Sequence, residues 1–332
     1  MKISIIIPVY NVEAYVERCL KSVMTQTYHG TIECLIVDDC GTDKSMEVME
    51  KVLRGYQGPI DFKILHHDHN RGLSAARNTG MDATTGDYLF FLDSDDEISA
   101  DCIEAMAVPL KEEQYDLVVG NVRTIGCDSL HRSILLKLED GKVLRGKEIE
   151  SSYHIKWKMI AVNKLYRTDF IRQQGLRFKE GLVHEDELWS LQVACLARSL
   201  RAVNKFTYVY YVREGSIMHT PDLEERRCRM LKIIVAEICK FLKERHLFSV
   251  RAYQLMQKFF WRSLRPSLND KKRFVREYCE LRSSAVLPLI YHIRASGVHF
   301  RAQMRNFYYI LPPRLAGKIL FHRINKSNHQ SL

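Results

Sequence analysis

The sequence has no long hydrophobic run and no paired cysteine motif. Its 332 residues contain no uninterrupted apolar stretch of about 18 residues, the length that a membrane-spanning helix requires. The amino-terminal segment lacks the basic region, apolar region and cleavage site of a signal peptide. Nine cysteines occur without a CxxC pair, and their odd number argues against a zinc ribbon or a disulfide framework. We therefore expect a cytoplasmic protein without a transmembrane segment.

The charge of the chain is unevenly distributed. With 46% hydrophobic and 27% charged residues, the composition is that of a globular protein with a sizeable core. Residues 1–200 contain 24 Lys and Arg against 31 Asp and Glu, whereas residues 201–332 contain 26 against 9. The acidic part is compatible with a metal site. The basic part requires an anionic partner such as phosphate, nucleic acid or lipid headgroups.

The first hundred residues alternate between apolar runs typical of buried strands and segments with helical spacing. Strands are expected at 3–9, 32–37, 62–65 and 88–92, and helices at 12–24 with Asn11 as the cap, after Gly41 and at 73–83. Repeated strand–helix units predict an α/β fold, with a mostly parallel sheet and helices on both faces. Residues 110–220 are expected to be mixed, with a strand at 117–122 and a helix from about 185 to 200.

After Pro221 the pattern becomes helical and basic, so we place a domain boundary near residue 221. Helices are expected at 223–244, 250–264 and 271–281. Aromatic residues, Phe259, Phe260 and Trp261, lie among the basic ones. Such amphipathic helices favour a membrane surface or an internal packing face over nucleic acid, and we expect no nucleic-acid partner.

Three polar segments follow expected strands, and in parallel sheets these carboxyl ends meet at one edge where ligands bind. They are 8–11, Asp38-Asp39 and Asp93-Ser94-Asp95-Asp96. Three carboxylates within four residues repel one another unless a cation or hydrogen-bond donors compensate them. Oxygen-rich sites of this kind select Mg²⁺ or Mn²⁺, which share their coordination with substrate phosphates. The alternative is a solvated turn.

Asp38 and Asp39 can accept hydrogen bonds from a base or ribose, or they can cap a turn. Arg77 and Asn78 lie at the start of a helix built of small residues, which permits close approach of a ligand. Arg77 can equally be a structural ion-pair partner, and the two roles are compatible.

Four strings together resemble the family-2 glycosyltransferases, which have the GT-A fold. They are Ser4-Ile5-Ile6-Ile7-Pro8-Val9-Tyr10-Asn11, Val37-Asp38-Asp39-Cys40-Gly41-Thr42-Asp43, Asn70-Arg71-Gly72-Leu73-Ser74-Ala75-Ala76-Arg77-Asn78 and Leu92-Asp93-Ser94-Asp95-Asp96. The order and spacing of the strings match the family as well. Cys40 departs from it, because Gly, Asn or Ser is frequent there. The resemblance covers about the first 100 residues.

The resemblance implies a nucleotide-sugar site. Its residues would be Pro8, Tyr10 and Asp39 at the base, Asp95 and Asp96 at the ribose and the metal-bridged diphosphate, and Asp38, Arg77, Asn78 and Asp93 around them. Asp95 and Asp96 would hold Mn²⁺ or Mg²⁺, which acts as a Lewis acid on the leaving diphosphate. Residues 1–100 would bind the donor, and residues 101–220 would form the acceptor side.

The string Val183-His184-Glu185-Asp186-Glu187-Leu188-Trp189 resembles the family's segment that supplies the catalytic base, which would be Asp186. Acidic residues also favour helix N-termini, by about 0.3–1 kcal/mol each, so a purely structural role is the alternative. Further segments resemble the family and could contact acceptor or diphosphate, or could be structural. They contain Asn163, Lys164, Glu185, Arg213 and Ser216.

The Gln-x-x-Arg-Trp string of processive synthases is missing. The sequence thus predicts a non-processive, inverting enzyme that moves a hexose from a nucleotide-sugar, expected to be a UDP-sugar, to a glycan or lipid-linked acceptor of a bacterial surface polysaccharide. The basic region 221–332 would attach it to the anionic inner face of the cytoplasmic membrane. Two alternatives stay open: a nucleotidylyltransferase, which would need a glycine-rich basic loop after the first strand, and a non-enzymatic basic binding protein.

Overall fold

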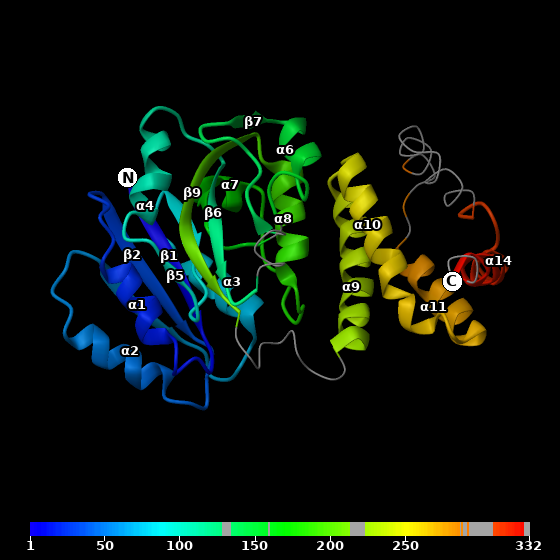
Figure 1. The fold of residues 1–332 in the computed structure, drawn as a ribbon, viewed down its shortest axis with the longest axis horizontal. Coiled ribbons are helices and arrows are strands. Elements are labelled where there is room, and N and C mark those ends of the chain that lie inside the picture. The colour runs from blue at the N-terminus through cyan, green and yellow to red at the C-terminus, as the bar shows by residue number, and fades with distance from the viewer. Residues whose placement is uncertain are drawn as a thin grey trace. The chain divides into compact units, whose positions relative to one another are not determined.

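The computed structural model describes residues 1–127, 134–158, 160–212, 223–285, 287, 291 and 308–328. The chain divides into two compact units, Met1–Ser216 and Ile217–Leu332 (Figure 1). The boundary that the sequence suggests at residue 221 lies outside the described residues. Each unit is treated by itself below.

The first unit is built on a nine-stranded sheet with the order β3-β2-β1-β4-β8-β6-β9-β5, and β7 pairs with β9. The strands are β1 Lys2–Val9, β2 Thr31–Asp38, β3 Asp61–His66, β4 Tyr88–Phe91, β5 Glu97–Ile98, β6 Leu117–Ile125, β7 Val143–Arg145, β8 Lys164–Arg167 and β9 Ser199–Tyr211. Strands β3, β2, β1 and β4 are parallel, β8 is antiparallel to both of its neighbours, and β6 is parallel to β9. The α/β fold with a mostly parallel core is confirmed.

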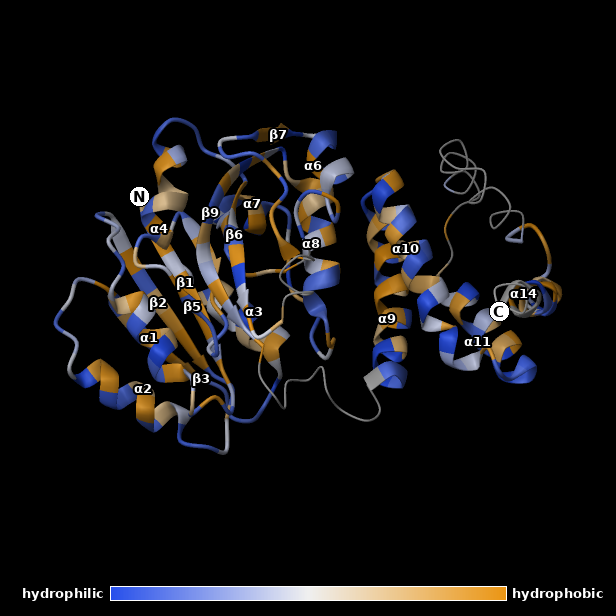
Figure 2. Cartoon of the chain, viewed as in Figure 1, coloured by the Kyte–Doolittle hydropathy of each residue, from blue (hydrophilic) through white to orange (hydrophobic). Residues whose placement is uncertain are grey.

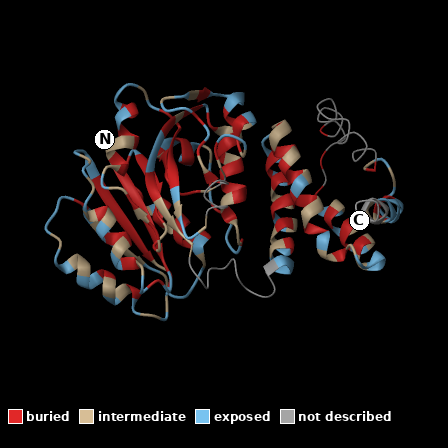
Figure 3. Ribbon diagram, viewed as in Figure 1, coloured by how far each residue is buried: buried red, intermediate tan, exposed pale blue. Residues whose placement is uncertain are grey.

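Strand β1 shows why the centre of the sheet forms where it does. Every residue from Ile3 to Val9 is buried, as expected for a strand covered on both faces. The central strands are accordingly hydrophobic in Figure 2 and buried in Figure 3. The parallel register pairs Val9 with Asp38, so that β1 and β2 end together and their polar continuations start at the same edge.

Helices flank this sheet. They are α1 Val16–Met24, α2 Ser45–Arg54, α3 Leu73–Ala83, α4 Cys102–Ala107, α6 Lys147–Ser152, α7 Thr168–Gln173 and α8 Glu185–Leu196, with a 3-10 turn at Val108–Lys111. The expected cap Asn11 is wrong: α1 begins only at Val16, and Asn11 Oδ1 instead accepts a hydrogen bond from Thr42 N at 2.8 Å. Helix α3 packs closely on the sheet, since a Cβ on Gly80 would lie 2.4 Å from Ile6 Cγ2.

The second unit is helical in its described residues. Its helices are α9 Leu223–Glu244, α10 Val250–Ser263, α11 Lys271–Ser284 and α14 Pro313–Asn328, with a 3-10 turn at Arg265–Ser267. Phe259 and Phe260 are buried, and the ring of Phe260 lies 5.8 Å from that of Tyr278 on α11. These aromatic residues therefore form the unit's own core. Within the described part of the chain, no helix combines the length and hydrophobicity needed to cross a bilayer.

Candidate active site at the carboxyl edge of the sheet

The loops after β1 and β2 form one side of the site. Tyr10 is 46% exposed directly beyond β1, whereas Pro8 is buried within the strand. The Asp38 carboxylate accepts a hydrogen bond from Cys40 N at 3.1 Å and contacts His66 Nδ1 at 3.0 Å. Cys40 has a φ of 56°, a left-handed conformation that Gly and Asn adopt more readily. The departure at Cys40 from the family pattern is thus accommodated with some backbone strain.

Asp39 is buried and organises the loop between β3 and α3. One carboxylate oxygen contacts His67 Nδ1 at 2.6 Å and accepts from Arg71 N at 2.8 Å. The other accepts from Asn70 Nδ2 at 3.1 Å and from Gly72 N at 2.8 Å. Gly72 has a φ of 85°, which favours glycine at this turn into α3. The geometry gives Asp39 a structural position behind the edge.

Arg77 joins two segments that are far apart in the sequence. Its side chain is 3% exposed, and its guanidinium donates to Asp93 Oδ1 at 2.7 Å and to Glu185 Oε1 at 2.5 Å. The Arg77 cation also lies 5.2 Å from the ring of Phe178. It therefore ties the end of β4 to the start of α8, as the structural alternative for Arg77 expected.

Two of the predicted asparagines, Asn78 and Asn163, are buried within the protein. Asn78 exchanges hydrogen bonds with the backbone of Phe178, both at 3.0 Å. Asn163 is fully buried, donates to Asn121 O at 2.9 Å and accepts from Thr207 Oγ1 at 2.9 Å. Asn78 thus ties α3 to the segment around Phe178, and Asn163 links β6 to β9, so both amides have structural partners.

Lys164 is 1% exposed, and its ammonium donates to the backbone oxygens of Ile160 and Val162. Burial lowers the pKa of the Lys164 ammonium to about 7, and the charge of Asp186 acts in the opposite direction. A diphosphate cannot reach so buried an amine in this geometry. Glu185 likewise is engaged by Arg77 and is not turned to a ligand.

The segment 93–96 begins where β4 ends. Asp93 and Asp95 are half-buried, and one oxygen of Asp93 is held by Arg77. Asp96 is buried, and its two oxygens accept hydrogen bonds from Tyr208 Oη at 2.7 Å and from Tyr211 N at 2.9 Å. Burial, followed by the charges of Asp95 and Asp93, raises the pKa of Asp96 well above its ordinary value.

Asp186 lies in the first turn of α8 and is half-buried. His184, the residue directly before α8, has a φ of 66°, a conformation that is costly for a non-glycine residue and is frequent at functional sites. Burial, followed by the charges of Glu185 and Glu187, raises the pKa of Asp186 well above its ordinary value, whereas Arg77 lowers it. Such a carboxylate is a stronger base than an exposed one.

The same carboxylates also affect the pKa of Tyr210 on β9. Burial raises the pKa of its hydroxyl, and the charges of Asp96, Asp93, Asp95 and Asp186 raise it further. The carboxylates of the β4 end and of α8 thus act on one half-buried tyrosine. The sequence analysis missed β9, although its Tyr208-Val209-Tyr210-Tyr211 run is typical of a strand.

Of the two residues predicted to hold a divalent cation, Asp95 suits this role better than Asp96. Among the described residues no group of three or more His, Cys, Asp and Glu is arranged to hold a metal. Asp96, one of the two predicted ligands, gives both oxygens to β9. Mg²⁺ is commonly held by one or two carboxylates together with substrate phosphates, so Asp95 still suits such a site. Arg213 and Ser216 lie outside the described residues.

The arrangement combines an exposed aromatic ring at Tyr10, the carboxylates of residues 93–96 and, at Asp186, a carboxylate with a raised pKa. An exposed tyrosine at a sheet edge can stack on a nucleobase. Carboxylates next to phosphate need a cation between them. A carboxylate whose pKa is raised is suited to general-base catalysis.

Comparisons with known proteins find glycosyltransferases. The model of the family described as glycosyl transferase family 2 matches residues 4–175. Glycosyltransferase GlyA of Streptococcus pneumoniae is 35% identical over 225 residues, which are 65% of this chain and 31% of GlyA. The uncharacterized glycosyltransferase YibD of Escherichia coli is 25% identical over 328 residues, 92% of each protein.

Solved structures support the fold. The 1–349 fragment of TarS of Staphylococcus aureus, crystallised with UDP-GlcNAc, superimposes with a TM-score of 0.72 at 20% identity, covering 100% of this chain and 92% of the fragment. Full-length TarS, a poly(ribitol-phosphate) β-N-acetylglucosaminyltransferase, is 24% identical, and the match covers 54% of it. The chain thus spans about half of TarS and a third of GlyA.

Proposed function

Since this chain belongs to glycosyl transferase family 2, we propose that it is a non-processive, inverting enzyme that moves a hexose from a UDP-sugar to a glycan or lipid-linked acceptor. The acceptor would belong to a bacterial surface polymer. The observation that carries the proposal is the link made by Arg77, which holds Asp93 of the aspartate segment and Glu185 beside Asp186 on one buried guanidinium. Donor-binding and proton-accepting groups are thereby fixed relative to each other.

The donor residues divide by exposure. Tyr10 would stack on the base, with Asp38 beside it, and Asp95 and Asp93 would face the ribose and the diphosphate. Pro8, Asp39, Arg77, Asn78 and Asp96 would support these groups from the interior, because the structure buries all five. The UDP preference is supported by the fold shared with the TarS fragment, which was crystallised with UDP-GlcNAc.

The reaction follows from these positions. The acceptor hydroxyl gives its proton to the Asp186 carboxylate, and its oxygen attacks the anomeric carbon on the face opposite the diphosphate. The bond from this carbon to the diphosphate oxygen breaks, and the nucleoside diphosphate leaves with the electron pair. Mn²⁺ or Mg²⁺ held by Asp95 would neutralise the charge that develops on the leaving diphosphate.

We expect donor binding to depend on a divalent cation, because a diphosphate beside Asp93 and Asp95 is otherwise repelled. A screen of UDP-, GDP- and dTDP-sugars for divalent-dependent nucleotide release identifies the donor. Calorimetry should then show that EDTA weakens UDP binding by about tenfold or more, and that Asp95→Asn does the same with Mn²⁺ present. Asp61→Asn, an exposed carboxylate at the amino end of β3, is the control and should bind as wild type. Equal UDP affinity with and without EDTA would remove the metal from the proposal.

The second unit offers a surface for an anionic membrane. Residues 281–332 contain eight Lys and Arg and no Asp or Glu. On α14, Leu315 and Ile319 are 48% and 39% exposed, one turn apart, and Arg314 and Lys318 are exposed beside them. The other side of α14 packs on α11, where Phe321 contacts Phe274 at 5.6 Å between ring centroids. Apolar residues among basic ones suit a helix that lies in the headgroup region.

We therefore expect the full chain to bind vesicles that contain phosphatidylglycerol and not vesicles of phosphatidylcholine alone. Changing Leu315 and Ile319 together to Ser should weaken this binding by roughly tenfold, because two apolar side chains no longer leave water. Ile233→Ser, at an exposed isoleucine of α9, serves as the control. Cosedimentation measures both. If the double variant binds like the control, α14 is not the attachment surface.

A further inference from the structure

One side of α1 holds the backbone of the segment that carries the aspartates. Cys19 Sγ lies 3.6 Å from Asp93 O, Arg18 Nη2 donates to Asp95 O at 2.7 Å, and Ser22 Oγ accepts from Ile98 N at 3.2 Å. Further along, Gln26 Nε2 donates to Ser99 O at 2.7 Å. These contacts join residues 18–26 to residues 93–99 at four points. The aspartate segment is therefore fixed by α1, and not only by β4.

Arg18 is the charged residue among these, and its side chain contacts Asp95, Glu97 and Tyr211. Besides Asp95 O, its guanidinium carbon lies 3.6 Å from the centre of the Tyr211 ring, and its Nε lies 3.7 Å from Glu97 Oε2. Tyr211 in turn donates to Glu97 Oε1 at 2.6 Å and, through its backbone N, to Asp96 Oδ1 at 2.9 Å. The interactions form a closed network around residues 95–97.

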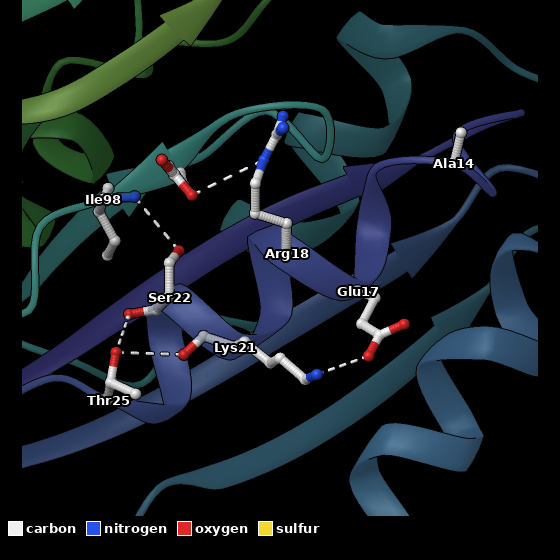
Figure 4. A pocket seen from close by; sticks show the side chains of 8 residues that line it. Ala14, Glu17, Arg18, Lys21, Ser22, Thr25 and Ile98 are labelled. Carbon is white, nitrogen blue, oxygen red and sulfur yellow. Dashed lines mark hydrogen bonds and ion pairs between the residues drawn. The ribbon is translucent and has the colours of Figure 1, made fainter.

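The network lies beside a cavity of about 630 Å³, which is lined by Arg18, Lys21 and Ile98 among others (Figure 4). Arg18 is 37% exposed by its side chain, and Lys21, one turn further along α1, is 62% exposed. The Lys21 ammonium pairs with Glu17 at 2.6 Å within the same helix, as the dashed line in Figure 4 marks. Of these two cations, Arg18 contacts the aspartate segment at Asp95 O, whereas Lys21 pairs with a residue of its own helix.

We propose that Arg18 is a positioning residue of the donor site. It holds the Asp95 peptide and the end of β9 in a single arrangement, and it acts on the donor through Asp95 and not by direct contact. The inference rests on the proposed function, since it takes Asp95 as a donor and metal residue. The Tyr211 ring contributes to this arrangement, because the Arg18 guanidinium stacks on it and is oriented by it.

The test uses the full chain, the UDP-sugar that wild type turns over, and Mn²⁺. Arg18→Leu should raise donor KM and the dissociation constant for UDP by about tenfold, or 1.4 kcal/mol, with kcat changed less than threefold. Arg18→Lys can still donate to Asp95 O and should recover at least half of this loss on a logarithmic scale. Lys21→Leu should stay within twofold of wild type.

Tyr211→Leu separates positioning from direct contact. If Arg18 acts through the network, Tyr211→Leu weakens UDP binding as well, and the double variant with Arg18→Leu loses less than the sum of the single losses. Melting temperatures are measured in parallel, and Arg18→Lys replaces Arg18→Leu if the latter is unfolded at the assay temperature.

Two results would overturn the inference. Unchanged UDP affinity in Arg18→Leu, with only a lower melting temperature, would leave Arg18 a purely structural role. Additive losses in the double variant would indicate that Arg18 contacts the diphosphate itself. Wild-type protein that binds no nucleotide sugar would instead contradict the proposed function and, with it, this inference.

Discussion

Asp186→Asn should lower the transfer rate by about 10²–10⁴ and leave the dissociation constant for UDP within twofold of wild type. Asn keeps the size of the side chain at the start of α8 but cannot accept the proton of the acceptor hydroxyl. Loss of a general base lowers a rate by about 10²–10⁴, which is equivalent to roughly 3–5 kcal/mol of transition-state stabilisation. Steady-state kinetics and calorimetry separate the two quantities.

The pH dependence provides a second readout for Asp186. The rate requires the ionised carboxylate, so kcat/KM of wild type should rise with pH through the pKa of Asp186. Burial and the neighbours Glu185 and Glu187 raise this pKa, and the acid limb should therefore lie well above the ordinary pKa of an aspartate, about 3.9. The residual activity of Asp186→Asn should lack this limb.

Asp186→Asn should lower the transfer rate but raise the stability of the protein at pH 8. A carboxyl whose pKa is raised in the folded state binds its proton more tightly there, so stability falls as the pH rises from the unfolded toward the folded pKa. Asn cannot ionise and avoids this loss. The melting temperature of Asp186→Asn should thus equal that of wild type near pH 4 and exceed it at pH 8.

A purely structural Asp186 would behave differently. If it only favours the helix N-terminus, Asn costs at most about 1 kcal/mol of stability and turnover stays near normal. Asp169→Asn, an exposed aspartate in the first turn of α7, is the matched control for this effect. A rate within tenfold of wild type would exclude Asp186 as the base and move attention to Glu187.

Arg77→Met should destabilise the protein and also impair catalysis. It removes the partner of Asp93 and Glu185 while leaving both carboxylates in place, and an uncompensated buried charge costs roughly 3 kcal/mol or more. Arg77→Lys should recover only part, because an ammonium cannot reproduce the two directed guanidinium contacts. Chemical denaturation measures the loss.

Arg177→Met is the control, since Arg177 forms a two-point ion pair with Asp82 at 2.5 and 2.8 Å but is 49% exposed. Such a surface pair contributes about 0–1 kcal/mol. Arg77 also lowers the pKa of Asp186, so in Arg77→Lys, which keeps the cation, the acid limb of kcat/KM should stay close to that of wild type. In Arg77→Met the limb should move to higher pH. An unshifted limb in folded Arg77→Met would show that the two residues are not coupled.

The first hundred residues are the part of the fold that the sequence predicts well. Continuous apolar runs predicted β1 and β2, and small residues at helical spacing predicted α3 with its observed bounds, Leu73–Ala83. These patterns are local. The expected helix from about 185 to 200 ends at Leu196, because Ser199 already starts the long strand β9. That strand has mixed exposure, which masks its period.

The sequence predicts a set of site residues, but it does not predict which of them are exposed at the edge of the sheet and which are buried behind it. The sequence predicts that Asp39 and Asp96 contact the donor or the metal, because both are acidic and follow strands. Their partners, Arg71 N and Gly72 N for the one and Tyr211 N for the other, are backbone groups 32 to 115 residues away. The Arg77–Glu185 link spans 108 residues. Only the folded chain brings these atoms together.

The anomeric configuration of the released sugar tests the central claim most directly. With water as acceptor, an α-linked UDP-sugar should be cleaved by wild type in the presence of Mn²⁺, and proton NMR in the first minutes should show the β-anomer before mutarotation mixes the two. Asp186→Asn should release it at least about 10² times more slowly. Initial release of the α-anomer, or no divalent-dependent cleavage of any nucleotide sugar, would contradict an inverting transfer with Asp186 as the base.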